Sequence, residues 1–362
     1  MAASPRVSVV MTTYNGGRFV RETIDSILTQ SFTDFEFLII DDNSTDNTVE
    51  IIKSYNDPRM QLFRNPENIG ISRTRNRGID LARGEYLAAT DHDDISLPKR
   101  LERQVEFLDT NPDVVLVGTA AWFMENNTIT HSCDAVTDPY VMHWGLLTQS
   151  RLVPSSTCMR LNILRHHKIY YRPEYDYADD YDLFHRLAQV GKVVSIPDCL
   201  SIYRIHENNN TKLHRTEMKV NSERILFEVY RDFLGLELSH VDIDCIWRIF
   251  SSIEAARDDT ELLKAGTLLQ TALKAFLKCM QLEAEHAKAV QDFASTDWWH
   301  AVSRTARALG RRGILKCYRA IPELSTTVPS FAETCATLAV ASLGPRLMNP
   351  LRHMKTLFKR PS

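Results

Sequence analysis

The sequence lacks the features that mark several common classes of protein. None of its seven cysteines forms a C-x-x-C pair, and this odd, scattered set argues against a disulfide framework or a zinc knuckle and for a reducing compartment. No basic-then-apolar leader opens the chain, and no apolar run reaches the roughly 20 residues that span a bilayer. The formal net charge of −3 gives no reason to expect nucleic acid as a partner. We therefore expect a cytoplasmic protein.

Two glycine-rich fingerprints of nucleotide-binding proteins are also absent. The chain contains neither G-x-x-x-x-G-K nor G-x-G-x-x-G, which excludes a P-loop and the dinucleotide motif. What is present is an ordinary globular composition, with 44% hydrophobic and 25% charged residues. At 362 residues the chain is long enough for one large domain and a smaller one.

The first half alternates short apolar runs with segments of helical spacing. The apolar runs predict strands at residues 7–11, 35–40, 60–63, 86–89 and 114–117. Helical segments separate the first four runs, and a further helix is predicted over 180–190. Strands separated by helices indicate βαβ units and a parallel sheet, and near-continuous apolar strands indicate a sheet covered on both faces.

The second half has a different pattern. Residues 207–211 are polar and without periodicity, which predicts a mobile loop. Beyond them, helical spacing continues almost without interruption from residue 215 to about 319. We therefore predict an α/β domain over 1–212 and a mainly helical region over 213–362.

Polar clusters follow three of the predicted strands at their carboxyl ends. They are T-T-Y-N-G over 12–16, D-D-N-S-T-D over 41–46 and D-H-D-D over 91–94. In an open parallel sheet, ligands bind beyond the carboxyl ends of the strands. Taken alone, the second cluster also fits a turn with an Asx cap, but the coincidence of three clusters predicts a binding site.

The acids at 91–94 are the sharpest of these features. Clustered carboxylates repel one another unless a cation or a proton neutralises them. A divalent ion such as Mg²⁺ or Mn²⁺ takes carboxylate and phosphate oxygens as ligands. The cluster therefore predicts a metal site that also holds a phosphate group. The alternative is a solvated acidic turn that caps the helix beginning near Pro98.

Six segments in order along the chain resemble glycosyltransferase family 2, whose members share the GT-A fold. They are V-S-V-V-M-T-T-Y-N-G (7–16), F-L-I-I-D-D-N-S-T-D-N-T (37–48), N-I-G-I-S-R-T-R-N-R-G (68–78), G-E-Y-L-A-A-T-D-H-D-D (84–94), A-D-D-Y-D-L (178–183) and Y-R-I-H (203–206). The resemblance covers about residues 7–206. It implies a Rossmann-like, mainly parallel sheet flanked by helices, followed here by a helical extension.

The resemblance also implies an activity. Members of the family move a sugar, with inversion at its anomeric carbon, from a nucleotide-diphosphate sugar to a hydroxyl group. UDP is the favoured nucleotide on family frequency alone. The acceptor would be a glycan or a lipid-linked precursor, in the synthesis of a cell-surface polysaccharide or glycolipid.

The family pattern assigns a nucleotide-binding role to residues at the first two strand ends and on the following helix. Thr13 and Tyr14 would line the base pocket, and Asp42 would bind the base or the ribose. Arg75 and Asn76 would help to hold the base and the diphosphate.

The acidic cluster and the Y-R-I-H segment would complete the donor site. Asp91 would bind the ribose, and Asp93 would coordinate the metal, Mn²⁺ or Mg²⁺. His206 would reach the metal or the diphosphate, and an imidazole suits Mn²⁺ better than Mg²⁺. A lone histidine is more often structural, so this alternative stays open. Arg204 would pair with a phosphate or with a structural carboxylate such as Asp182.

The pair Asp179-Asp180 opens the helix predicted over 180–190. Acids are favourable in the first turn of any helix, which is the alternative explanation of the pair. In the family this place reads Glu-Asp, and the Asp is the base that deprotonates the acceptor hydroxyl. The match gives that role to Asp180 and a substrate contact to the shorter Asp179.

The end of the chain is basic. After residue 300 there are eleven Lys and Arg residues against two acids, and apolar residues in 345–359 recur at roughly helical spacing. Such a segment suits adsorption to the inner face of an anionic membrane, but it also suits a solvated face of a helix bundle. Both alternatives stay open.

Two other functions compete with glycosyl transfer. A sugar-nucleotide pyrophosphorylase also uses a nucleotide-binding sheet, but it carries a glycine-rich, basic loop after the first strand, where this chain has T-T-Y-N-G-G-R. A non-catalytic scaffold that binds nucleotide sugars would not need Asp93 and Asp180 together.

Overall fold

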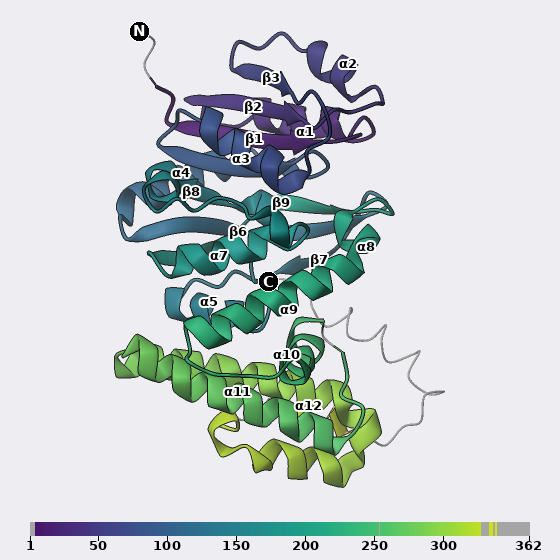
Figure 1. Cartoon of the computed structure of the whole chain (residues 1–362), viewed down its shortest axis with the longest axis vertical. Helices are drawn as coiled ribbons and strands as arrows, with labels where there is room; N and C mark the ends of the chain where they lie inside the picture. Colours follow the sequence, from purple (N-terminus) through teal and green to yellow (C-terminus); the bar gives the residue numbers. More distant parts are fainter. Residues whose placement is uncertain (1–3, 253, 327–332, 336, 339–362) are drawn as a thin grey trace. The chain divides into compact units, whose positions relative to one another are not determined.

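The computed structural model describes residues 4–252, 254–326, 333–335 and 337–338 (Figure 1). The chain forms two compact units. Unit 1 comprises residues 1–146 and 150–225, and unit 2 comprises residues 147–149 and 226–362. Because residues 147–149 belong to unit 2, neither unit is one continuous stretch of chain.

Unit 1 is built on a mixed nine-stranded sheet (Figure 1). Its strands are β1 (Val7–Thr13), β2 (Phe35–Asp41), β3 (Met60–Arg64), β4 (Tyr86–Asp91), β5 (Ile95–Ser96), β6 (Val114–Glu125), β7 (Thr128–Cys133), β8 (Cys158–Arg160) and β9 (Lys192–Ile205). Their order is β3-β2-β1-β4-β8-β6-β9-β5, with β7 paired to β6. Strands β1 to β4 are parallel, as predicted, whereas β8 is antiparallel to both of its neighbours.

Helices surround this sheet, and the core lies between them and the strands. The helices of unit 1 are α1 (Val20–Leu28), α2 (Thr48–Lys53), α3 (Ile71–Leu81), α4 (Arg100–Thr110), α5 (Pro139–Leu146), α6 (Leu161–His166), α7 (Asp179–Ala188) and α8 (Asn210–Leu213). Every residue of β2 is buried, which is the burial expected of a strand covered on both faces. The core joins β1, β2 and β4 to α1 and α4.

One glycine sets how closely α3 lies against the sheet. A Cβ atom on Gly78 would come within 2.4 Å of the Val10 side chain of β1, so only glycine fits there without displacing that side chain. The close approach places the residues one turn earlier on α3, including Arg75, at the carboxyl edge of the sheet.

Several predicted elements differ in length from those observed. The strand predicted over 114–117 runs to residue 125, and the helix predicted over 180–190 forms at 179–188. The predicted loop at 207–211 is partly helical, because α8 begins at Asn210. β9 spans Lys192–Ile205 and lies parallel to β6. This pairing joins two distant segments, so no local sequence pattern predicts it.

Unit 2 is helical, as predicted for the second half of the chain. Helix α9 (Arg215–Asp232) begins in unit 1 and continues into unit 2. It is followed by α10 (His240–Ile246), a π-helical stretch (Trp247–Ser251), α11 (Asp259–Met280) and α12 (Ala284–Ala320). The division between the units thus falls within α9, further along the chain than the predicted boundary at 212.

The long helices of unit 2 pack around a buried tryptophan. Trp298 has no exposed surface, and a Cβ atom on Gly266 of α11 would come within 2.7 Å of its ring. Within the parts of the chain that the structure describes, no helix is long and apolar enough to cross a membrane. The basic segment at 345–359 lies outside the described residues.

Candidate active site

The carboxyl ends of three neighbouring strands bring the predicted polar clusters together. In the parallel register Thr13 of β1 lies opposite Asp41 of β2, and Thr12 lies opposite Asp91 of β4. The clusters at 12–16, 41–46 and 91–94 therefore share one edge of the sheet. This is the edge at which open α/β sheets bind their ligands.

Two neighbouring residues at the end of β1 have the properties of a base pocket. The Thr13 side chain is 2% exposed, and its hydroxyl has no hydrogen-bond partner among the residues described. Tyr14 follows it with 47% of its surface exposed. A buried polar atom without a partner usually marks a ligand or water contact. An exposed aromatic ring beside it suits a planar heterocycle.

Asp42 organises the turn that leads into α3. Its carboxylate accepts hydrogen bonds from the Asn65 amide at 2.7 Å and from the backbone N–H groups of Ile69 at 2.9 Å and Gly70 at 3.0 Å. Gly70 has a φ of +89°, a left-handed conformation that favours glycine. In this structure Asp42 thus fixes the start of the helix that carries Arg75, while its predicted contact with the base or ribose stays a prediction.

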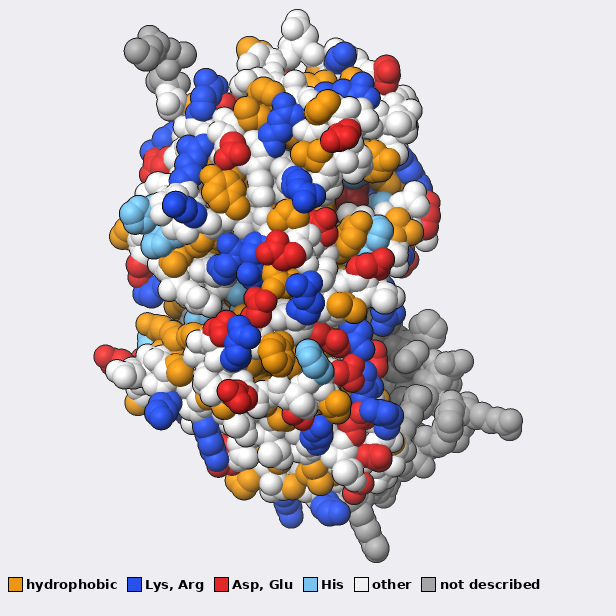
Figure 2. Space-filling model, viewed as in Figure 1, with side chains coloured by type: hydrophobic (Ala, Val, Ile, Leu, Met, Phe, Trp, Pro, Cys, Tyr) orange, Lys and Arg blue, Asp and Glu red, His pale blue; other side chains and the backbone are white. Residues whose placement is uncertain are grey.

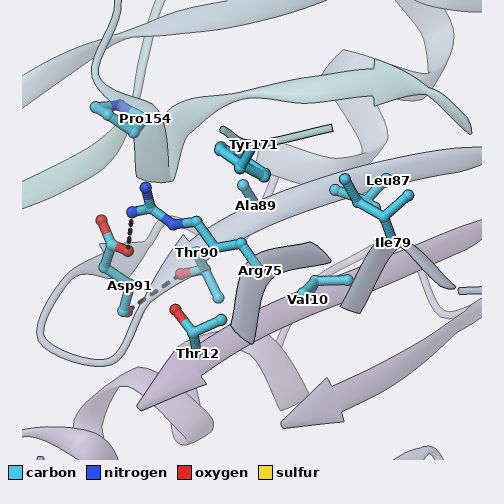
Figure 3. A pocket seen from close by; sticks show the side chains of 10 residues that line it. All are labelled: Val10, Thr12, Arg75, Ile79, Leu87, Ala89, Thr90, Asp91, Pro154 and Tyr171. Atoms are coloured by element: carbon cyan, nitrogen blue, oxygen red, sulfur yellow. Dashed lines mark hydrogen bonds and ion pairs between the residues drawn. The ribbon is translucent and has the colours of Figure 1, made fainter. Parts of the chain in front are cut away.

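Arg75 bridges two parts of the site. Its guanidinium bonds to Asp179 at 2.9 Å and to Asp91 at 3.2 Å (Figure 3 shows the bond to Asp91). Burial alone would lower the pKa of Arg75, but the charges of Asp179 and Asp91 outweigh it and hold that pKa well above its usual value. The Tyr171 ring lies 5.3 Å from the guanidinium carbon. One cation thus links the acidic cluster after β4 to the start of α7.

Asn76, the next residue on α3, has a different set of partners. Its side-chain amide donates to the Tyr171 carbonyl and accepts from the Tyr171 N–H, both at 2.8 Å. This reciprocal pair holds the segment before α7 against α3. The predicted contact of Asn76 with the donor stays a prediction.

Asp93 and His206 form the pair that the sequence predicts for a metal. His206 Nε2 lies 2.9 Å from Asp93 Oδ2, although the two residues are 113 positions apart. Neighbouring ligands of an octahedral ion with bonds of about 2.1 Å are about 3 Å apart, so this separation fits a divalent ion. Among the described residues there is no group of three or more His, Cys, Asp or Glu side chains that could hold a metal ion.

The charge state of Asp93 also fits a metal ligand. Burial alone would raise the pKa of Asp93, but the hydrogen bond from His206 and the charges of His92 and His206 outweigh it, so its pKa is lowered. A ligand carboxylate must be deprotonated to bind a metal. The Phe19 ring packs 4.8 Å from the His206 ring and fixes its position.

Arg204 is held by structural partners. Its Nε donates to the Asp93 carbonyl at 2.9 Å, its guanidinium pairs with Glu22, and the Phe19 ring lies 4.6 Å away. The suggestion of Asp182 as its carboxylate partner is wrong, because Asp182 binds the arginines at 172 and 186 instead. A phosphate contact of Arg204 stays a prediction.

Asp94 belongs to the predicted acidic cluster, but the sequence gives it no separate role, and the structure shows it tethered by hydrogen bonds. It is 2% exposed, and its carboxylate accepts the Arg204 N–H at 2.9 Å and the Ser155 hydroxyl. The Thr23 hydroxyl donates to its carbonyl at 2.8 Å. Burial and the charges of Asp93 and a further acid raise the pKa of Asp94 well above its usual value. The only indication in the sequence is its place in D-H-D-D. That motif does not distinguish a residue that binds a ligand from one that holds neighbouring segments in place.

Asp179 and Asp180 open α7, and their environments differ. Asp179 is 1% exposed and is paired with Arg75, whereas the Asp180 carboxylate accepts only the Tyr181 N–H, at 2.7 Å, among the hydrogen bonds of the described residues. Burial and the charge of Asp179 raise the pKa of Asp180 to about 7. A carboxylate with that pKa can take up a proton near neutral pH, which is what a general base requires.

Comparison with known proteins shows which class of protein shares this fold. Residues 8–168 match the model of Glycosyl transferase family 2. An uncharacterized glycosyltransferase of Haemophilus influenzae is 25% identical over 270 residues, which are 69% of this chain and 82% of that protein. The putative glycosyltransferase EpsE of Bacillus subtilis is 41% identical over 122 residues, 33% of this chain and 44% of EpsE.

Two solved structures share the fold. TarS of S. aureus in complex with UDP-GlcNAc has a TM-score of 0.53 and 18% identity, covering 88% of this chain and 90% of that one. The mannosyltransferase PcManGT of Pyrobaculum calidifontis in complex with GDP-Man and Mn²⁺ has a TM-score of 0.53 and 17% identity, covering 84% and 88%.

Fold and matches together define a glycosyltransferase with the GT-A fold, as predicted. Residues 8–168 carry a domain that matches glycosyltransferase family 2, and the curated relatives are glycosyltransferases. The two curated relatives reported above are named glycosyltransferases and PcManGT is named a mannosyltransferase, so neither a pyrophosphorylase nor a non-catalytic scaffold is favoured.

Proposed function

We propose that the protein is a metal-dependent, inverting glycosyltransferase that moves a sugar from a nucleotide-diphosphate sugar, with UDP favoured, to a hydroxyl group of a glycan or lipid-linked acceptor. The observation that carries the proposal is the Arg75 bridge. It joins Asp91, next to the metal-type pair, to Asp179, next to a carboxylate whose pKa is near neutral. The groups that bind the donor and the group that activates the acceptor would thus lie around the guanidinium of Arg75.

The residues would divide the reaction between them. The acceptor oxygen forms a bond to C1 of the sugar, its proton passes to the Asp180 carboxylate, and the bond from C1 to the diphosphate breaks with its electron pair on the leaving oxygen. Arg75 has five N–H donors, of which its ion pairs use two, so it can also bind the diphosphate. A divalent ion held by Asp93 and His206 would neutralise the charge that builds on the diphosphate.

One carboxylate acting as base is enough for this step, which supports inversion over retention. A direct displacement turns an α-linked donor sugar into a β-linked product, or the reverse. Proton NMR of the product formed first would measure its anomeric configuration. Retention would overturn the direct displacement.

The metal and base assignments can be separated by calorimetry. UDP would be titrated, with and without Mn²⁺, into wild type, Asp93→Ala and Asp180→Asn. We expect Asp93→Ala to lose the Mn²⁺-dependent part of binding, and Asp180→Asn to keep it. The exposed Asp34→Ala is the matched control, since it removes a carboxylate away from the site. Equal affinity of wild type and Asp93→Ala would remove Asp93 from the metal site.

A membrane-bound acceptor is the second part of the proposal. The basic, apolar segment at 345–359 would bring the enzyme to the inner membrane surface. Each basic residue near anionic lipid contributes about 1 kcal/mol, which salt screens. Co-sedimentation with anionic and neutral vesicles would compare the full chain with a version ending at Gly344. Binding to anionic vesicles that falls with salt and with truncation is expected, and no binding at low salt by either form would point to a soluble acceptor.

A further inference from the structure

A small cavity opens beside Arg75 in unit 1, and the role assigned to Arg75 does not account for it (Figure 3). Two sets of side chains line it. The apolar set comes from β1, β4 and α3, from Pro154 in the short 3-10 helix before β8, and from Tyr171 in the segment before α7, and the polar set lies around Asp91. The lining residues are Val10, Thr12, Arg75, Ile79, Leu87, Ala89, Thr90, Asp91, Pro154 and Tyr171.

The cavity is lined by Ala89, a residue of a central strand. Ala89 lies in the middle of β4, between β1 and β8, and is opposite Val10 in the register. Its neighbour Ala88 has no exposed surface, whereas Ala89 keeps part of its surface accessible. A larger side chain at this point would fill the space. The small side chain of Ala89 therefore keeps the cavity open.

The size of the cavity limits what can enter it. Its volume is about 20 Å³, which is enough for one water molecule or one methyl group and too small for a sugar ring. An apolar floor disfavours a water molecule, because water needs several polar partners. The occupant that fits is thus a small apolar group attached to a larger molecule at the mouth of the cavity.

The polar residues beside the cavity set a second requirement for the group that occupies it. Arg75 has N–H donors beyond those used by its two ion pairs, and the Asp91 carboxylate beside it is an acceptor. An acetamido group presents a methyl, a carbonyl acceptor and an N–H donor within a few ångströms. A hydroxyl group would leave the apolar floor empty. The methyl of a deoxy sugar would fill the floor but use neither polar partner.

We propose that this cavity takes the acetamido methyl of the donor, so that the sugar transferred is an N-acetylhexosamine. The inference rests on the proposed function, because it requires a nucleotide-sugar donor at this edge of the sheet. In it, Ala89 is a specificity residue, with Val10, Ile79 and Leu87 as the floor.

The test compares two donors that differ at one substituent. UDP-N-acetylglucosamine and UDP-glucose would be titrated with Mn²⁺ into wild type and into Ala89→Val, which fills the cavity and suits a strand. Wild type should prefer the acetamido donor by about tenfold or more, the effect of one small apolar group in a matched pocket. Ala89→Val should lose most of that preference and still bind UDP-glucose as wild type does.

Two controls separate the outcomes. Ala188→Val makes the same change on α7 away from the cavity and should leave the preference unchanged, and unchanged UDP affinity shows that Ala89→Val is folded. Equal binding of both donors by wild type, a preference that Ala89→Val retains, or binding of neither UDP sugar would overturn the inference. Failure of the proposed function looks different, because then UDP, GDP and dTDP would all fail to bind with Mn²⁺.

Discussion

The two acidic ends of the site differ in the direction in which their surroundings shift the pKa of a carboxylate. At the donor end, defined by residues 91–94 and 204–206, His206 lowers the pKa of Asp93 against the effect of burial. At the acceptor end, defined by Asp179 and Asp180, burial and a neighbouring negative charge raise the pKa of Asp180 to about 7. A metal ligand must stay ionised, whereas a general base must exchange a proton near neutral pH. In the proposed mechanism, the same side-chain type would thus serve two roles because its neighbours differ.

Removing the base should give the largest effect and leave the donor end intact. Asp180→Asn keeps the shape of the side chain but cannot accept the acceptor proton. We expect kcat to fall by about 10² to 10⁴ while UDP affinity with Mn²⁺ stays within about twofold of wild type. Steady-state kinetics and calorimetry on the same preparation measure both. An unchanged kcat would show that the two ends do not divide the work as described.

Removing the donor-end imidazole should have a smaller effect, with a metal signature. We expect His206→Ala to weaken Mn²⁺-dependent UDP binding by about tenfold, and to reduce the preference for Mn²⁺ over Mg²⁺, since imidazole suits Mn²⁺. Titrations with each metal in turn would measure the preference. His214→Ala, a histidine that stacks on Tyr177 at 3.8 Å, is the matched control and should leave the metal preference unchanged.

The pH dependence of the rate should report on the acceptor end. Because the pKa of Asp180 is about 7, the base is protonated below that pH, and kcat/KM should fall about tenfold per pH unit on the acid side. Asp179→Asn removes the neighbouring negative charge that helps to raise this pKa, so the acid limb should move to lower pH. Asp179→Glu keeps the charge and should leave the limb in place. A rate independent of pH between 5 and 8 would contradict the assignment of Asp180.

The smallest effect is expected at the rim of the donor end. Arg18 and Glu207 form an ion pair at 2.6 Å, but their side chains are 62% and 68% exposed. Exposed pairs contribute little to stability and weaken with salt. Glu207→Gln should therefore change KM for the donor by less than about threefold. A tenfold change would mean that this pair contacts the donor directly.

The sequence predicts which polar clusters share one edge of the sheet, but not the contacts that their side chains make there. The polar clusters at 12–16, 41–46 and 91–94 meet at one edge because parallel strands bring their carboxyl ends together, a consequence of fold class alone. The bonds of Asn76 to Tyr171 and of Arg204 to Glu22 join segments about 95 and 182 residues apart. Such partners follow from tertiary packing, and no local pattern encodes them.

The fold shows the same limit. Apolar runs and helical spacing predict β1 to β4 and the helices of unit 2, because these elements follow from local periodicity. The pairing of β6 with β9 and the antiparallel insertion of β8 depend on chain segments that are far apart. The place where the chain divides, inside α9, was not visible either, since a continuous helix has no break in its pattern.

Residues 147–149 are synthesised long before the residues that they contact. They belong to unit 2, where the Leu147 carbonyl accepts the Tyr230 hydroxyl at 3.1 Å and the Thr148 carbonyl accepts the Ser251 hydroxyl. Domains usually fold as they leave the ribosome, amino-terminal unit first. Here residues 147–149 lie in the sequence between the two parts of unit 1. Their partners Tyr230 and Ser251 are synthesised some 80 to 100 residues later. A nascent chain stopped at residue 225 would carry the whole sheet but neither of these two hydroxyl partners.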